Sequence, residues 1–269
     1  MVDVLKWLLV AAAALVAIAW AVQEKLIFFP PPAAPAPRVE PSASLEEIAL
    51  RTQEGHRLHG WLARRGASPS ALIIYFGGNA EETSWLVGES YRLGDWSVLA
   101  VNYRGYGRSE GTPGERELLG DAPLVYDYAV SRRDVDSRRI VLMGRSLGAA
   151  VAVHLASQRP AAGLVLVTPF DSLAEVGAAH YPFLPVRWLL RHRFDSTALA
   201  RSIRAPVLMI AADADTIVPP KHAKRLFEAW GGPREWVALP GADHNDVEAH
   251  PAYWNSIRGF LARVPPRAP

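Results

Sequence analysis

Short apolar runs recur along this chain between more polar segments. The run at 71–76 is uninterrupted, which is typical of a strand buried on both faces of a parallel sheet. These runs span residues 71–76, 97–103, 138–143, 163–169, 206–212 and 234–240. Segments of helical character alternate with them, at 81–93, 115–130, 147–157, 220–230 and 251–264. The alternation predicts an α/β fold with a mostly parallel central sheet that helices cover on both faces.

Two segments ahead of these runs have a different pattern. Residues 45–52 and 56–63 are predicted as strands, and Gln53–Gly55 between them as a turn. We therefore expect an antiparallel pair at one edge of the sheet. In sheets of this class, ligands bind at the carboxyl ends of the parallel strands. Catalytic side chains are therefore expected in the loops that follow each strand.

The N-terminus carries an uncharged apolar run, Trp7–Val22, preceded by Lys6. With its apolar neighbours it approaches the roughly 20 residues that a membrane span needs, so we predict a transmembrane helix within 1–29. The alternative is a cleaved signal peptide, with cleavage motifs at 17–19 or 19–21. The positive charge of Lys6 predicts that this end lies inside, which places the rest of the chain on the outer, periplasmic side.

After the N-terminal segment, the sequence predicts a spacer, one domain and a short tail. Prolines at 30–41 predict a stiff, extended spacer. One α/β domain is expected over 42–264, with a short insertion at about 170–203, and residues 265–269 form a tail. Removal of residues 1–29 is then expected to leave a soluble, active domain.

Composition narrows the classes of function. The net charge is +2 and basic residues interleave with acidic ones, so no nucleic-acid partner is expected. There is no cysteine, which excludes disulfides, thiol catalysis and cysteine-ligated zinc. No metal-ligand cluster, phosphate-binding loop or dinucleotide fingerprint is present in the sequence, so no cofactor is expected. We expect the chain to act as a monomer.

Two stretches match the nucleophile pattern of serine hydrolases, "GRSEG" at 107–111 and "GRSLG" at 144–148. A nucleophile elbow needs a strand, a sharp turn that carries the serine, and a helix that begins at once. Ser146 meets each requirement, because an apolar strand precedes it and Leu147 opens a helix. Ser109 lies in a glycine-rich irregular loop. We therefore predict Ser146 as the nucleophile; the alternative role for it is that of an ordinary helix N-cap.

The acid and the base are expected after Ser146, in the order acid and then histidine. The loop after strand 206–212 offers Asp213 and Asp215. A turn role suits Asp213 better, so Asp215 is predicted as the acid. His244 directly follows strand 234–240 and is predicted as the base, whereas His250 opens the last helix, where a capping role is ordinary.

The loop Gly77–Ala80 after strand 71–76 is the expected second part of an oxyanion hole. Its glycines let the backbone approach a substrate, and the backbone N–H of Asn79 is the predicted donor, paired with that of Leu147. Taken alone, Gly-Gly-Asn is also an ordinary turn sequence.

Several longer motifs together are specific to one group of proteins. They are "EKLIFFPP", "YFGGNAEE", "VNYRGYGRSEGTPGE", "GRSLGAAVA", "TPFDSLAEVG", "DADTIVPPKHAKRLFEAW" and "GADHNDVEAHPAYWNSIRGFL". From about residue 24 to its end, the chain resembles the membrane-anchored α/β-hydrolases, a group that includes bacterial inner-membrane proteins and eukaryotic protein depalmitoylases. The resemblance implies Ser146, Asp215 and His244 as a catalytic triad. The chain departs from the group at Gly77, where its members usually have histidine.

These predictions converge on a serine hydrolase that cleaves acyl esters or thioesters through an acyl-enzyme. The alternatives are a serine peptidase or aminopeptidase of the same fold, and a non-catalytic membrane-tethered binding module. The insertion at 170–203 is rich in apolar residues, among them Tyr181, Phe183 and Trp188. They form either a small packed cap or an apolar wall for a lipid-like acyl substrate.

Overall fold

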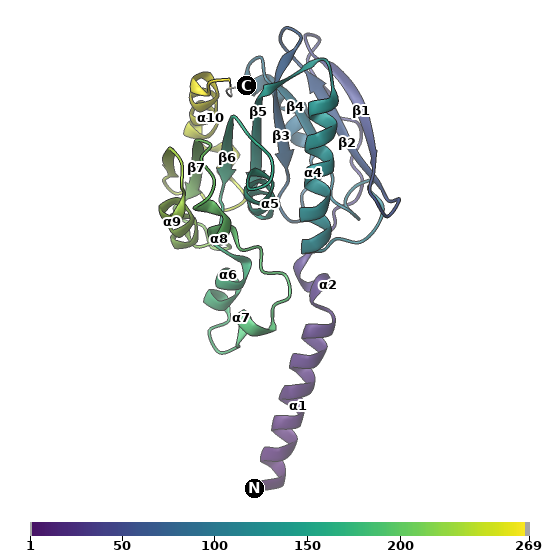
Figure 1. Ribbon diagram of the computed structural model, residues 1–269. Helices are drawn as coiled ribbons and strands as arrows, with labels where there is room; N and C mark the ends of the chain where they lie inside the picture. Colours follow the sequence, from purple (N-terminus) through teal and green to yellow (C-terminus); the bar gives the residue numbers. More distant parts are fainter. Residues whose placement is uncertain (1, 267–269) are drawn as a thin grey trace.

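A computed structural model describes residues 2–266; of the predicted tail, residues 267–269 lie outside it. One eight-stranded sheet forms the centre of the domain, in the order β1-β2-β4-β3-β5-β6-β7-β8 (Figure 1). The strands are β1 (Ser44–Arg51), β2 (Arg57–Arg64), β3 (Ser70–Phe76), β4 (Ser97–Val101), β5 (Val135–Arg145), β6 (Gly163–Val167), β7 (Val207–Ala212) and β8 (Arg234–Leu239).

Strand direction follows the sequence-based prediction. β1 pairs with β2 and β2 with β4 in antiparallel register, whereas every pair from β4 to β8 is parallel. The predicted α/β fold and its antiparallel edge pair are therefore confirmed. The carboxyl ends of β3, β5, β6, β7 and β8 lie along one edge of the sheet, and the loops that leave this edge carry the candidate chemistry.

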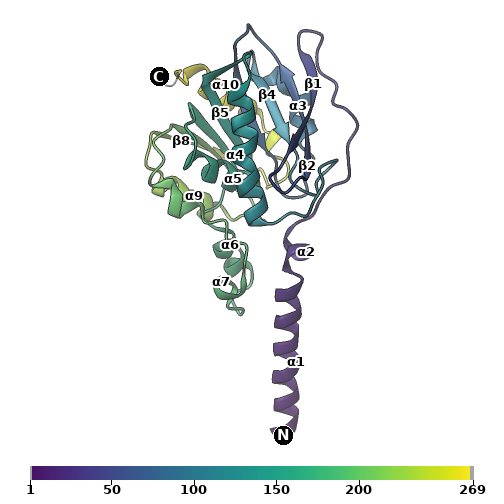
Figure 2. The same ribbon diagram turned by 45° about the vertical axis from the view of Figure 1, so that its right-hand side comes forward.

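Helices cover both faces of the sheet and bury two apolar cores. One core lies beneath α4 (Glu115–Ser131), α5 (Leu147–Ala156), α8 (Ser196–Ala200) and α9 (Pro220–Ala229). The other lies beneath α3 (Ser84–Gly88), the 3₁₀ helix η1 (Ser90–Leu93) and α10 (Pro251–Arg263) (Figure 2). Because alternate residues of a strand point to opposite faces, the uninterrupted apolar runs fill both cores.

The helix predicted at 81–93 is interrupted. It divides into α3 and η1, and both begin after the loop that leaves β3. The Glu82 carboxylate accepts the backbone N–H of Ser84 at 3.0 Å, and the Glu81 carboxylate accepts that of Gly78 at 2.8 Å. These two side chains hold the turn before α3, so the helix begins at Ser84 and not at Glu81.

Helix α1 (Val2–Ala21) extends away from the domain, on the side to which the insertion also projects (Figures 1 and 2). Among residues 2–266, no helix combines the length and the apolar character that a bilayer crossing requires. The predicted transmembrane helix is therefore not found. The uncharged part of α1 after Lys6 covers roughly 22 Å at about 1.5 Å per residue, and a hydrocarbon core is about 30 Å thick.

The short helix α2 (Gln23–Ile27) and Phe28 pack against the domain. Only 3% of the Phe28 surface is exposed, and its ring meets the rings of His192 and Phe194 edge-on, at centroid distances of 5.1 and 6.3 Å. A cut after residue 29 removes this core side chain. The core therefore includes part of segment 1–29, whereas the solubility and activity of a chain without residues 1–29 stay a prediction.

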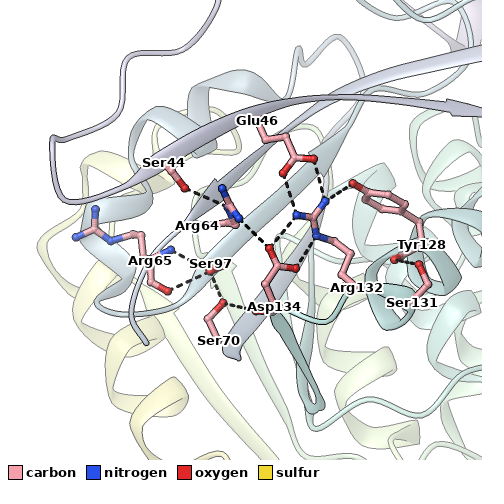
Figure 3. A network of polar contacts seen from close by, with 10 residues as sticks. All are labelled: Ser44, Glu46, Arg64, Arg65, Ser70, Ser97, Tyr128, Ser131, Arg132 and Asp134. Carbon is pink, nitrogen blue, oxygen red and sulfur yellow. Dashed lines mark hydrogen bonds and ion pairs between the residues drawn. The ribbon is translucent and has the colours of Figure 1, made fainter. Parts of the chain in front are cut away.

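A polar network lies near the amino ends of the parallel strands, at the end of the sheet opposite the candidate chemistry (Figure 3). Arg132 donates to both carboxylate oxygens of Glu46 and of Asp134, and Arg64 donates to Asp134 at 3.0 Å. The hydrogen bonds from Arg132 lower the pKa of Asp134 to about 2. This network links edge strand β1 to the start of β5, and we assign it a structural role.

Candidate active site

The turn between β5 and α5 has the geometry of a nucleophile elbow. Ser146 has a φ of 51° and Leu147 begins α5. A Cβ on Gly144 would lie 2.1 Å from the Gly148 carbonyl oxygen, and one on Gly148 would lie 2.0 Å from that of Phe76. Both positions therefore require glycine. Left-handed backbone at a serine is strained, and strain of this kind is found at catalytic turns.

The rival serine, Ser109, is structural. It is buried, its hydroxyl donates to the Asn102 carbonyl oxygen at 2.9 Å, and it accepts the His59 backbone N–H at 2.8 Å. Its oxygen joins β2 to the loop after β4, which agrees with its exclusion as a nucleophile.

The structure brings Asp215 and His244 together across 29 residues of sequence. His244 Nδ1 lies 2.7 Å from Asp215 Oδ2, and both side chains are buried. The other carboxylate oxygen of Asp215 accepts the backbone N–H groups of Ile217 at 2.9 Å and Val218 at 2.6 Å. The carboxylate is therefore fixed from two sides, and its second oxygen is directed at the imidazole.

The neighbouring candidates have other contacts. Asp213 is exposed and accepts the Gly241 backbone N–H at 2.6 Å, which is the turn role that the sequence favoured. His250 caps α10 by accepting the Ala252 backbone N–H at 3.2 Å. Asp243 accepts the backbone N–H groups of Thr216 and His244, and these hydrogen bonds lower its pKa.

The loop after β3 lies beside the elbow. A Cβ on Gly78 would be 3.8 Å from the Cβ of Ser146. Within residues 2–266, no acceptor is found for the backbone N–H of Asn79 or of Leu147. The Gly77 carbonyl oxygen accepts the Tyr103 hydroxyl at 2.8 Å, which fixes the start of the loop. Two unpaired N–H groups next to an elbow serine are the donors that an oxyanion hole requires.

A partly buried ion pair that the sequence-based prediction missed connects this loop to the histidine loop. Glu81 Oε2 accepts the Gly78 N–H and lies 3.4 Å from Arg145 Nη1. Arg145 Nη2 donates to the His244 carbonyl oxygen at 3.0 Å. Burial alone would lower the pKa of Arg145, but the charge of Glu81 raises it above its usual value. Arg145 directly precedes Ser146. Its hydrogen bond to the His244 carbonyl oxygen therefore ties the elbow to the loop that carries the base.

Tyr75 completes the environment of Glu81. Its hydroxyl donates to Glu81 Oε1, which also accepts the indole N–H of Trp85 at 2.6 Å. Burial, and then the neighbouring Glu81 charge, raise the pKa of the Tyr75 hydroxyl well above its usual range, so that it remains a donor. The Glu81 carboxylate is thus surrounded by donors, as a buried charge requires. Glu81 thus braces the loop that begins at Gly77, the position where the proteins that this sequence resembles usually have histidine.

The Asn79 side chain is held by the N-terminal segment. Its amide donates to the Ile27 carbonyl oxygen, and its Oδ1 accepts the Phe29 backbone N–H at 3.0 Å. The Tyr106 hydroxyl donates to the same oxygen at 2.7 Å. Residues 27–29 therefore help to position the residue whose backbone N–H is the candidate oxyanion donor.

Comparison with known proteins shows the family of this chain. The family model described as "Serine aminopeptidase, S33" matches residues 67–196. An uncharacterized protein of Mycobacterium tuberculosis is 42% identical over 94% of this chain and 92% of its own. The alpha/beta hydrolase domain-containing protein aho-3 of Caenorhabditis elegans is 30% identical over 84% of this chain and 68% of its own. The chain belongs to the α/β-hydrolase family.

Solved structures of esterases share the fold of this α/β-hydrolase. The esterase Pf2001 of Pyrococcus furiosus is similar with a TM-score of 0.70 and 22% identity, over 88% of this chain and 99% of its own. An acetyl xylan esterase from Paenibacillus has a TM-score of 0.69 and 20% identity, over 84% and 85%. At these identities the likeness shows the fold alone. A site for a metal ion, built from three or more suitable side chains, is not found in the described part of this hydrolase.

Proposed function

We propose that this α/β-hydrolase is a serine hydrolase that cleaves acyl esters or thioesters, with Ser146, His244 and Asp215 as its triad. The observation that carries the proposal is the buried His244–Asp215 pair at 2.7 Å, joined through Arg145 to the turn that holds Ser146. A buried carboxylate on imidazole Nδ1 fixes the tautomer in which Nε2 accepts a proton.

The proposed reaction has two halves. In the first, Ser146 Oγ attacks the carbonyl carbon as His244 Nε2 takes the hydroxyl proton, and Asp215 stabilises the imidazolium. The N–H groups of Asn79 and Leu147 bind the negative oxygen of the tetrahedral intermediate. His244 then gives its proton to the leaving alcohol or thiol. In the second half, a water molecule passes a proton to His244 as its oxygen attacks the acyl carbon. The bond from that carbon to Ser146 Oγ then breaks, the acid leaves, and His244 returns the proton to Oγ.

A second candidate function is hydrolysis of amide bonds by the same residues, because the matching family model is described as a serine aminopeptidase. An aminopeptidase also needs an anionic group that binds the free amine of its substrate. We favour the ester and thioester reading because apolar residues dominate the cavity beside the insertion. Comparing p-nitrophenyl esters with aminoacyl p-nitroanilides separates the two.

Replacing Ser146 with alanine is expected to abolish ester hydrolysis by the full chain. The matched control is Ser109→Ala, which removes the hydroxyl of the other Gly-x-Ser-x-Gly match and should retain turnover wherever circular dichroism shows it folded. Turnover that survives in Ser146→Ala contradicts the proposed nucleophile. A folded wild-type chain without turnover on any ester, thioester or anilide favours the non-catalytic binding module.

We also propose that the protein associates with a membrane surface through α1. Helix α1 exposes large apolar side chains along its length, and exposed apolar surface marks interaction sites; these are Val4, Trp7, Leu8, Val10, Leu15, Ile18 and Trp20. The full chain is expected to stay in the membrane fraction after a high-salt wash, because apolar contacts are not screened by salt. Release by salt contradicts the proposal, and a chain without residues 1–21 is the control. The side of the membrane on which the domain lies stays a prediction, which rests on the charge of Lys6.

A further inference from the structure

An apolar cavity of about 580 Å³ lies between the N-terminal helices and the insertion. One wall comes from the end of α1 and from α2, and the other from α6 (Leu173–His180), α7 (Val186–Leu189) and the segments that flank α7. Its main lining residues are Trp20, Leu26, Ile27, Leu184, Leu189 and Leu190. The size falls within the range of about 300–1,000 Å³ that is usual for small-molecule sites.

Specific contacts hold the two walls together. The Gln23 side chain accepts the Arg191 backbone N–H at 2.8 Å and donates to the Leu189 carbonyl oxygen at 3.4 Å. Arg191 also pairs with Glu24 at 2.7 Å, and its guanidinium lies 4.8 Å from the Trp20 ring centroid. These contacts join two walls whose segments lie about 170 residues apart in sequence. The polar side chains that make them, Gln23, Glu24 and Arg191, lie where the two walls meet.

Hydrogen bonds connect both walls of the cavity to loops of the candidate active site. Ile27 lines it, and the Ile27 carbonyl oxygen accepts the amide of Asn79. Asn79 follows Gly78, which lies beside Ser146. On the other wall, the His180 ring lies 2.8 Å from the carbonyl oxygen of Ile217, in the loop that carries the candidate acid. Each wall is thus joined by a hydrogen bond to a loop of the candidate site, and the cavity lies beside that site.

We infer that this cavity binds the hydrocarbon chain of the acyl group, with the scissile carbonyl at Ser146. The inference rests on the proposed function, because it names where that enzyme holds its substrate. Its walls offer mainly aliphatic and aromatic side chains, which an alkyl chain can cover with a gain of about 0.8 kcal/mol per buried methylene. The N-terminal helices are then a part of the substrate site as well as a route to the membrane.

The test is a chain-length series of p-nitrophenyl esters, from acetate to decanoate, with the full chain and below the micelle concentration of each ester. For the wild type, kcat/KM is expected to rise roughly fourfold per added methylene until the cavity is filled. Leu26→Asp and Leu184→Asp place a carboxylate in opposite walls, and both leucines are about half exposed, so that folding should tolerate the changes. Each variant is expected to lower kcat/KM for decanoate at least tenfold and for acetate less than twofold.

The matched control is Phe183→Asp. Phe183 precedes Leu184 in the insertion but is 96% exposed and does not line the cavity. It should keep the wild-type chain-length profile. A profile that Leu26→Asp and Leu184→Asp leave unchanged, or a flat wild-type series, overturns the inference while acetate hydrolysis still supports the proposed function. Loss of membrane association in the two variants without a changed profile assigns the cavity to lipid contact and also overturns it.

Discussion

Asp215→Asn is expected to lower kcat for ester hydrolysis by about 10⁴-fold, with the fold intact. Asp215 Oδ2 lies 2.7 Å from His244 Nδ1. An amide in this place can donate a hydrogen bond to Nδ1 and so stabilise the wrong imidazole tautomer, with the proton on Nε2. That tautomer cannot accept the proton of Ser146. Steady-state kinetics with p-nitrophenyl butyrate measures the loss.

Asp213→Asn provides the comparison for this variant. Asp213 lies on the same loop, but it is exposed and its carboxylate accepts only the turn N–H of Gly241 among the contacts described for residues 2–266. Turnover is therefore expected to stay within about threefold of the wild type. If Asp213→Asn is the more damaging change, the assignment of Asp215 as the acid is wrong.

Phe28→Ala is expected to lower the free energy of unfolding by about 3–4 kcal/mol. The Phe28 side chain is 3% exposed and belongs to the core beneath α4 and α5, in contact with His192 and Phe194. Alanine leaves a cavity that these neighbours cannot fill. Urea denaturation of the full chain, followed by circular dichroism, measures the difference.

The adjacent phenylalanine is the control. Phe29 is 54% exposed, and its contact with Asn79 is made by its backbone, which alanine preserves. Phe29→Ala should therefore change the free energy of unfolding by less than about 0.5 kcal/mol. Equal effects of the two substitutions would contradict the packing of α2 and Phe28 against the domain.

The same packing predicts that a chain starting at residue 22 is more stable than one starting at residue 30.

Much of the fold follows from apolar patterning. The buried parts of strands β3, β4, β5, β6 and β7 are apolar runs, and such runs have one stable place, the central sheet of an α/β domain with helices on both faces. The elbow is predictable for a similar reason, because Gly144 and Gly148 are required by close backbone contacts on both sides of Ser146. Local chemistry and fold agree at these positions.

The sequence did not reveal contacts between distant segments. Glu81 and Arg145 both lie within motifs noted in the sequence, but their pairing and their link to His244 depend on how β3, β5 and the loop after β8 meet. The same holds for Asn79 and residues 27–29. No periodicity reports a hydrogen bond between loops, so these bracing contacts emerge only from the folded chain.

The insertion shows a further limit of patterning. Its apolar residues predict either a packed cap or an exposed wall, and the pattern is the same for both. In the structure Phe183 and Trp188 are 96% and 89% exposed, whereas Leu189 and Leu190 line the cavity beside α2. Which apolar residues turn inward is decided by the N-terminal helices, which a local pattern within 170–203 does not include.

The central claim is that Ser146 is an activated nucleophile. Treating the full chain with a fluorophosphonate probe, followed by proteolysis and mass spectrometry, tests it most directly, because the probe reacts with a serine activated by a neighbouring base. We predict one labelled peptide, modified at Ser146, absent in Ser146→Ala and retained in Ser109→Ala. Labelling that persists in Ser146→Ala, or a folded wild-type chain that the probe leaves unmodified, would contradict the account.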